Sequence, residues 1–189
     1  MGRRLPALLA GVLLLAGLTA CSSSSGGGQE GFVGSGTAIT QVPVGERQPA
    51  PEVSGPAVDG AREISVSAYA GKVVVLNVWG SWCSPCRAEA KDLQAASVET
   101  RARAQFVGLN ARDPDPAPAQ AFARSFGVTY PSIFDPDGSE VVKFARSLPP
   151  KSIPSTLILD RQGRLAVRVL GPISKVTLVD LINDVAAGR

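Results

Sequence analysis

The chain has no histidine among its 189 residues, and it has only three cysteines and one methionine. Zinc sites of the common kind take four thiolate or imidazole ligands, which this set cannot supply. A c-type haem site needs the pattern C-x-x-C-H, and Arg87 stands where that histidine would be. These absences leave few roles for the cysteines other than their own redox chemistry.

Aromatic residues and excess charge are also scarce. Aromatics make up 5% of the chain, and the net charge is +3. Two of the 19 basic residues are Arg3 and Arg4. Without the first twenty residues, the chain has 17 basic and 16 acidic residues, and its net charge is +1. Neither a basic stripe nor stacking platforms are present, which argues against a nucleic-acid partner.

The first twenty residues have the composition of a signal peptide: two arginines, an apolar run over residues 5–20, and small residues at its end. A membrane anchor is the alternative, but this run is shorter than the roughly 20 residues that span a bilayer. Leu18-Thr19-Ala20-Cys21 resembles the lipobox of bacterial lipoproteins. We therefore expect Cys21 to be lipid-modified after cleavage, which would leave two free thiols.

Residues 21–50 begin with a Ser/Gly-rich stretch and continue with a Pro-containing polar stretch. Such composition is typical of a flexible linker, so we expect a tether between the lipid and a folded domain over residues 51–189. This arrangement places the domain on the outer face of the cytoplasmic membrane, where thiols do not stay reduced without help.

Strand and helix patterns alternate along the folded part. Apolar β-branched runs predict buried strands, amphipathic runs predict helices, and the last two strands form a hairpin. We expect strands at residues 73–79, 105–110, 155–160 and 164–170, and helices at 84–96, 117–127 and 174–187. The order predicts an α/β fold with a mixed sheet.

The segment W-G-S-W-C-S-P-C-R places Cys83 and Cys86 where a buried strand passes into a helix. The helix N-terminus stabilises a thiolate, so Cys83 is the expected nucleophile. Cys86 lies about one turn into the helix, where we expect it to be shielded and to resolve the mixed disulfide. Pro85 restricts the loop. A purely structural disulfide is the alternative, but so short a loop adds little stability.

Three segments together resemble the TlpA/ResA-like membrane-anchored thioredoxins, which are related to the AhpC/TSA redoxins: V-V-V-L-N-V-W-G-S-W-C-S-P-C-R-A-E, Y-P-S-I-F-D-P-D-G and I-P-S-T-L-I-L-D-R-Q-G-R. The resemblance implies a thioredoxin-like fold, with a mixed central sheet flanked by helices, and no cofactor or metal beyond the redox-active disulfide. It also implies a cis Pro154 against the disulfide, with Ile153 offering backbone hydrogen bonds to a partner. Trp82, Ser84 and Pro85 would shape the docking surface.

The sequence differs from ordinary thioredoxins at Asn77, because they carry at this position a buried aspartate that accepts a proton. Glu89 is the replacement candidate, because it lies three residues after Cys86 on the same helix face and matches a glutamate of the TlpA/ResA-like proteins. A solvated surface carboxylate is the alternative. Trp79 and Trp82 are expected to shield the disulfide and shape the docking surface, and core packing is an equal alternative for Trp79. Arg87 is expected to face solvent.

The function implied by the resemblance is extracytoplasmic thiol-disulfide exchange. We expect a reductant of exported proteins such as apocytochromes c, supplied with electrons by a membrane thiol carrier of the CcdA type. A disulfide oxidase or isomerase has the same motif and remains an alternative. So does a non-catalytic binding lipoprotein. A peroxiredoxin is disfavoured, because Leu76 and Gly80 stand where its pattern needs Pro and Thr.

Overall fold

A mixed β-sheet forms the centre of the structure, a computed structural model that describes residues 1–2, 29–32 and 37–189. Its strand order is β1-β2-β9-β8-β5-β6-β7. The strands are β1 (Gln29–Phe32), β2 (Ala38–Gln41), β5 (Val73–Trp79), β6 (Ala104–Ala111), β7 (Ser132–Asp135), β8 (Ser155–Leu159) and β9 (Leu165–Leu170). Strand β5 pairs in parallel with β6 and antiparallel with β8. The expected mixed sheet is therefore confirmed.

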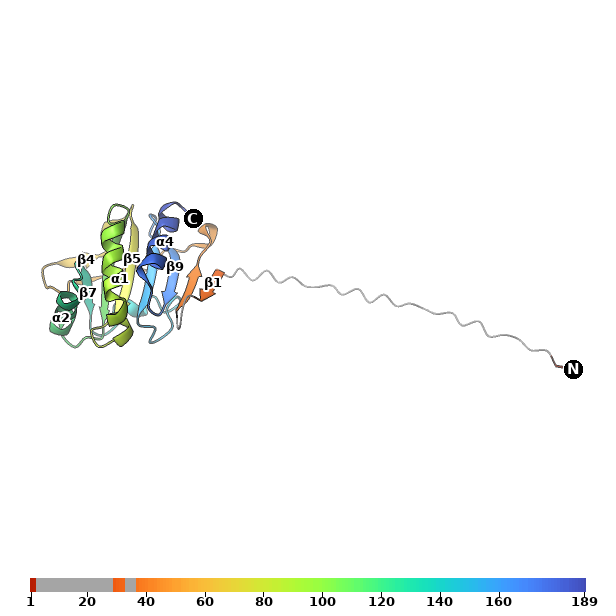
Figure 1. Ribbon diagram of the computed structural model, residues 1–189, viewed down its shortest axis with the longest axis horizontal. Coiled ribbons are helices and arrows are strands. Elements are labelled where there is room, and N and C mark those ends of the chain that lie inside the picture. Colours follow the sequence, from red (N-terminus) through yellow and green to blue (C-terminus); the bar gives the residue numbers. More distant parts are fainter. Residues whose placement is uncertain (3–28, 33–36) are drawn as a thin grey trace.

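Helices cover the sheet, and Figure 1 shows α1 and α4 side by side across one face. The helices are α1 (Ser84–Thr100), α2 (Pro116–Phe126), the short α3 (Ser139–Val142) and α4 (Lys175–Ala186), with 3-10 turns η1 (Val44–Glu46) and η2 (Val66–Tyr69). A small hairpin of β3 (Ser54–Pro56) and β4 (Glu63–Ser65) contacts β7. The structure thus has the mixed central sheet flanked by helices that the resemblance implied.

Strand β5 is buried along its whole length. Alternate side chains point to opposite faces of a sheet. On one face, Val73 and Val75 pack with residues of α1 and α4. On the other face, Val74 and Leu76 pack with residues of the β3–β4 hairpin and of the segment that follows α3. An apolar run without polar alternation is what burial on both faces requires. The strand ends at the loop that carries the cysteines.

Capping residues set the helix ends. The Asp115 carboxylate accepts a hydrogen bond from Ala117 N at the start of α2, and Gly127, with φ 68°, ends it. Ser174 caps α4 in the same way through Thr177 N. These contacts satisfy backbone groups that a helix end would otherwise leave unpaired.

The folded part begins earlier than the expected boundary at residue 51. Strand β2 pairs antiparallel with β9, and Ile39 is buried in the core beneath α4. Arg47 is buried too, with its Nη1 3.4 Å from the Asp160 carboxylate. The tether prediction is therefore wrong for residues 37–50, because this segment extends the sheet past β9. Cys21 and most of the expected signal peptide lie outside the described residues.

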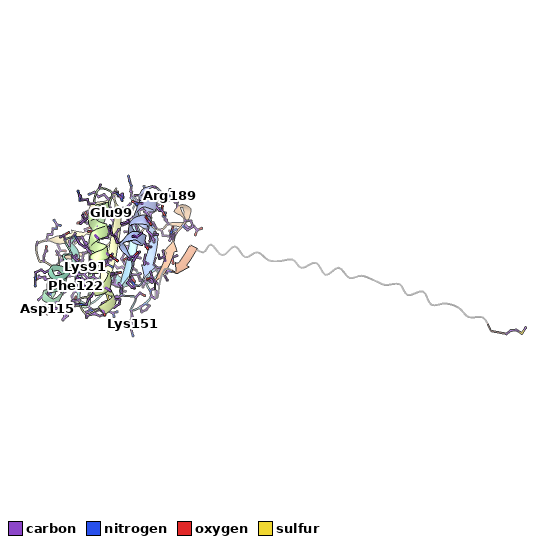
Figure 2. The ribbon with its side chains drawn as sticks, viewed as in Figure 1. Lys91, Glu99, Asp115, Phe122, Lys151 and Arg189 are labelled. Carbon is purple, nitrogen blue, oxygen red and sulfur yellow. A yellow bond between two sulfur atoms is a disulfide. The ribbon has the colours of Figure 1, made fainter. Side chains whose placement is uncertain are left out.

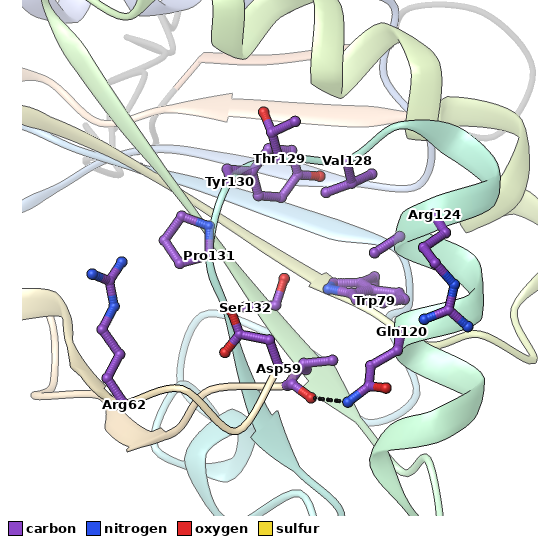
Figure 3. Close-up of a pocket in the computed structure, with 12 residues that line it drawn as sticks. Asp59, Arg62, Trp79, Gln120, Arg124, Val128, Thr129, Tyr130, Pro131 and Ser132 are labelled. Carbon is purple, nitrogen blue, oxygen red and sulfur yellow. Dashed lines mark hydrogen bonds between the residues drawn. The ribbon is translucent and has the colours of Figure 1, made fainter.

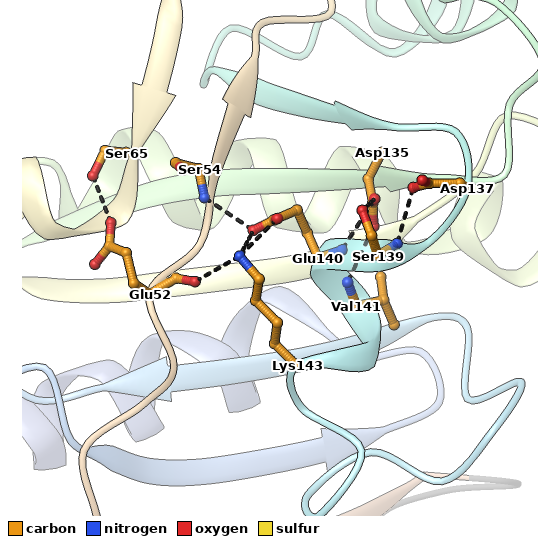
Figure 4. A network of polar contacts seen from close by, with 9 residues as sticks. All are labelled: Glu52, Ser54, Ser65, Asp135, Asp137, Ser139, Glu140, Val141 and Lys143. Atoms are coloured by element: carbon orange, nitrogen blue, oxygen red, sulfur yellow. Dashed lines mark hydrogen bonds and ion pairs between the residues drawn. The ribbon is translucent and has the colours of Figure 1, made fainter.

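Polar contacts connect Glu52, which precedes β3, to residues at α3 (Figure 4). Lys143 Nζ lies 2.7 Å from Glu140 and donates to the Glu52 carbonyl at 3.1 Å. Asp135, at the end of β7, accepts from the backbone N–H groups of Glu140 and Val141, both at 3.1 Å. Among the described residues, no helix is long and apolar enough to cross a membrane.

Candidate active site

The cysteine pair lies at the N-terminal end of α1, joined by a disulfide with an S–S length of 2.06 Å and Cα atoms 5.3 Å apart. Cys83 is the N-cap residue, and its sulfur accepts a hydrogen bond from Cys86 N at 3.2 Å. Such donors, together with the helix dipole, favour a negative charge on that sulfur after reduction. The geometry supports Cys83 as the nucleophile.

Loops from several elements meet at this end of the sheet. Figure 2 places Asp115, before α2, and Lys151, before β8, at the end of the molecule opposite to Glu99, which lies near the C-terminus of α1. Both sulfurs are covered, since Cys83 is 3% exposed and Cys86 is 1% exposed. Exposure thus does not distinguish the two residues in the oxidised state, although Cys86 is shielded as expected.

The loop before Cys83 is held by Asp113, a buried residue that the sequence reasoning missed. Its carboxylate accepts from Ser81 N at 3.0 Å, Ser81 Oγ at 2.5 Å and Asn110 Nδ2 at 2.6 Å. Trp82 Nε1 donates to the Ala111 carbonyl at 3.2 Å. The Trp82 ring lies against Gly80, because a Cβ on Gly80 would be only 2.5 Å from Trp82 Nε1. These contacts fix the loop on the end of β6.

The residues expected to meet a partner surround the disulfide. Trp82 is 52% exposed, and Ser84 and Pro85 are exposed as well. The peptide bond between Ile153 and Pro154 is cis, as the resemblance implied, and Ile153 packs against the cluster that contains both cysteines. The Ile153 N–H donates to the Lys151 carbonyl at 2.9 Å. A partner that binds this N–H must therefore displace the Lys151 carbonyl.

Glu89 is 3% exposed, which contradicts the surface-carboxylate alternative. Its Oε1 accepts from Asn77 Nδ2 at 3.1 Å, and its Oε2 accepts from Ile173 N at 3.0 Å. Burial raises the pKa of Glu89 from 4.5 to about 7, although these two hydrogen bonds oppose the shift. A carboxyl group with such a pKa can gain and lose a proton near neutral pH.

A small cavity of about 10 Å³ lies between Asn77 and Cys86, and Trp79 and Tyr130 also line it. Asn77 thus lines the same cavity as the resolving cysteine, and it donates to Glu89, which lies three residues after Cys86 on α1. Burial raises the pKa of Tyr130, and the neighbouring Glu89 charge raises it further. This tyrosine remains neutral and is not a competing proton acceptor near pH 7.

Trp79 lies in the core beside the cysteines, and Arg87 faces solvent. Trp79 is buried, with its ring centroid 4.5 Å from that of Phe122, and it packs in the cluster that includes both cysteines. Arg87 is exposed, with its guanidinium carbon 5.3 Å from the Phe126 ring centroid. In the part of the chain that the structure describes, no group of three or more His, Cys, Asp or Glu side chains could hold a metal.

Residues 47–168 match the AhpC/TSA family. The chain belongs to this family. It is 30% identical over 142 residues to the thiol:disulfide interchange protein DsbE of Allochromatium vinosum, covering 74% of this chain and 75% of that one. It is 29% identical over 118 residues to the thiol:disulfide interchange protein HelX of Rhodobacter capsulatus, covering 62% of this chain and 63% of HelX.

Solved structures of the same fold match this chain over nearly their whole length. A DsbF homologue from Corynebacterium diphtheriae is 34% identical with a TM-score of 0.73, covering 84% of this chain and 99% of that one. A secreted thiol-disulfide isomerase from Corynebacterium glutamicum is 30% identical with a TM-score of 0.75, covering 86% and 99%. The protein is a thioredoxin-like oxidoreductase, a class that uses redox-active cysteines and no further cofactor.

Proposed function

We propose that this protein is an extracytoplasmic reductant of disulfides in exported proteins, working through Cys83 and Cys86. One observation carries the proposal: the C-x-x-C pair has its first sulfur at a helix N-cap, and a buried carboxyl group, Glu89, lies three residues after its second cysteine on the same helix. A structural disulfide would need neither the thiolate-stabilising position nor a carboxyl group with a pKa of about 7.

The proposed reaction begins with both cysteines reduced. The Cys83 thiolate attacks a disulfide of the exported protein, forming a mixed disulfide and releasing one substrate thiolate. Cys86 then gives its proton to Glu89 and attacks the Cys83 sulfur, which releases the second substrate sulfur as a thiolate that takes a proton from water. Two electrons pass to the substrate, and the pair ends as the Cys83–Cys86 disulfide that the structure shows.

The names of similar proteins support thiol-disulfide exchange, and the reducing direction is our proposal. Among similar proteins are ResA of Bacillus subtilis, named a thiol-disulfide oxidoreductase, and the HelX and DsbE interchange proteins. We propose apocytochromes c among the substrates and a membrane thiol carrier of the CcdA type as the electron donor. A lipid on Cys21 and the residues that follow it would hold the domain near that carrier on the outer face of the membrane.

A second candidate is disulfide oxidation or isomerisation in secreted proteins. It is favoured by the likeness to the Corynebacterium glutamicum protein, which is named an isomerase and matches over 86% of this chain. The two functions differ in reduction potential and share the motif. A non-catalytic binding lipoprotein is a third candidate, and it is separated from both by an insulin-reduction assay with dithiothreitol, in which only an exchange enzyme accelerates precipitation.

Trapping the partner tests the proposal. A Cys86→Ser variant cannot resolve its mixed disulfide, so Cys83 stays joined to whatever it attacks. We expect adducts with exported C-x-x-C-H proteins or their assembly factors, identified by mass after non-reducing electrophoresis. A Cys83→Ser variant is the matched control and should trap none of these. Adducts with many unrelated secreted proteins would instead select the oxidase or isomerase.

A further inference from the structure

The loop that joins β9 to α4, residues 171–173, contacts two residues of the candidate active site. Gly171 N donates to the carbonyl of Pro154 at 3.0 Å. Ile173 N donates to Glu89 Oε2 at 3.0 Å. The cis proline and the buried carboxyl group are therefore bound to the same short loop, so whatever holds this loop in place also acts on the site.

A threonine from the segment before β2 holds the middle of this loop. Thr37 Oγ1 donates to the Pro172 carbonyl at 2.5 Å, although the two residues are 135 positions apart in the chain. Strand β2 pairs with β9, and the pairing of Ala38 with Leu170 brings Thr37 beside the loop. Thr37 is 5% exposed, so its side chain belongs to the folded part and not to a tether.

The Pro172 carbonyl and the Ile173 N–H belong to one peptide unit. A peptide unit is planar, and in the trans form, which this one has, its carbonyl and its N–H point in opposite directions. Thr37 and Glu89 therefore bind the two sides of a single rigid group. Rotation of this group away from Thr37 would also turn the N–H away from the carboxyl group. The hydroxyl thus fixes the direction of the hydrogen bond that Glu89 accepts.

From this geometry we infer that Thr37 is a positioning residue that acts on Glu89: its hydroxyl holds the Pro172–Ile173 peptide so that the N–H stays on the carboxyl group. Its importance for exchange rests on the proposed function, in which Glu89 accepts a proton. The inference gives a role in the site to the segment before β2, which lies outside the residues that match the family, 47–168.

The other groups around Glu89 stay the same when residue 37 is altered. The titratable side chains near its carboxyl group are Asp92 and, after reduction, Cys86 on α1, and Tyr130 in the segment that leads into β7 (Figure 3). Strand β5 contributes Asn77, which donates to the other carboxyl oxygen at 3.1 Å. On α4, Lys175 pairs instead with Glu99. A change in the pKa of Glu89 in a variant at position 37 therefore reports on the hydrogen bond from the loop.

A Thr37→Val variant nearly keeps the shape of the side chain and removes its donor. The peptide is then free to turn, and Glu89 loses a hydrogen bond that lowers its pKa. This pKa should rise from about 7 by roughly one unit, the scale of a lost hydrogen bond to a charged group. The ¹H–¹⁵N resonance of the Ile173 amide, followed in the oxidised protein as the pH is raised, measures the midpoint of this titration.

Three further variants accompany this one. Thr37→Ser keeps a hydroxyl at the same place and should keep the wild-type midpoint. Thr37→Ala removes the donor from a smaller side chain and should shift the midpoint as valine does, so the test does not depend on how well the valine variant folds. Thr40→Val removes from the same strand a hydroxyl that accepts from Arg168 at 2.8 Å, and it should leave the midpoint unchanged.

The rate of mixed-disulfide resolution separates this inference from the proposed function. If both hold, the pH at which the rate is half-maximal should move upward together with the amide midpoint in Thr37→Val. An amide midpoint that moves while the rate profile stays would support the positioning of Glu89 by Thr37 and contradict Glu89 as the proton acceptor. The inference is overturned if the amide midpoint in both Thr37→Val and Thr37→Ala equals that of the wild type, or if Thr40→Val shifts it as much.

Discussion

At the scale of single residues, the proposed mechanism of the second half of the exchange depends on Glu89. Resolution removes a proton from Cys86, and the position that serves this purpose in ordinary thioredoxins is occupied here by Asn77. Asn77 cannot take a proton, but it donates to Glu89 at 3.1 Å. We therefore propose separate roles for the two side chains, in which Asn77 orients the carboxyl group and Glu89 accepts the proton.

Replacing Glu89 by glutamine should slow the resolution of a mixed disulfide about a hundredfold, the usual scale of general-base catalysis. The wild-type rate should rise with pH through about 7, because Glu89 accepts a proton only when it is ionised. The variant should lack this rise. Stopped-flow measurement of the release of a chromogenic thiol from a Cys83 mixed disulfide checks both.

Glu99→Gln is the matched control for that experiment. Glu99 lies on the same helix, is exposed, and pairs with Lys175 at 2.7 Å. Its removal should leave the rate and the pH profile unchanged. A Glu89→Gln variant with wild-type kinetics across pH would return Glu89 to a structural role.

The same carboxyl group should make stability depend on pH. Its pKa is about 7 in the folded protein and 4.5 when unperturbed, so the unfolded chain loses this proton first as pH rises. The free energy of unfolding should therefore fall between pH 4.5 and 7, by up to about 3 kcal/mol relative to Glu89→Gln. Urea unfolding of the oxidised proteins at pH 5 and 8 measures this. Parallel pH dependences would contradict the raised pKa.

At the scale of elements, the sequence predicted the parts of the fold whose pattern is local. The apolar run of β5, the Pro85 start of α1 and Gly127 after α2 each carry their own signal, and each element formed where it was expected. Strand β7 was missed because it is short and lies within a segment dominated by turn residues. Strands β3 and β4 have three residues each, with Gly55 and Pro56 among them.

The parts of the site that have a local sequence pattern were predictable too. Cys83 and Cys86 were found from the C-x-x-C motif, and Pro154 was found from the family resemblance. The burial of Glu89 and the role of Asp113 were not readable from the sequence, because they depend on partners such as Ile173 and Ser81, which lie 84 and 32 residues away. Long-range contacts of this kind leave no spacing pattern in a single sequence.

Strand β2 offers a test of the corrected domain boundary. Ile39 is 5% exposed and pairs with Val169 of β9. Ile39→Ala should lower the free energy of unfolding by about 2 kcal/mol, the low end for a buried isoleucine. Gln41→Ala, an exposed change on the same strand, is the control. If both variants unfold like the wild type in urea, residues 37–50 behave as the tether first expected.

At the scale of the whole molecule, attachment to the membrane is expected to depend on Cys21. A Cys21→Ala variant cannot accept the lipid, so it should move from the membrane fraction to the soluble fraction while its folded domain keeps insulin-reducing activity. Immunoblots of the two fractions check this. A variant that still sediments with membranes would show that the N-terminal apolar run is itself the anchor.

We propose that the pair acts as a reductant in an oxidising compartment, and the redox state of Cys83 and Cys86 in intact cells tests this most directly. Acid quenching followed by alkylation with a mass-tagged maleimide separates the dithiol from the disulfide. We predict that the wild-type pair is mostly reduced, and that it becomes the disulfide when the CcdA-type carrier is removed. A wild-type pair that is oxidised while the carrier is intact would contradict the account.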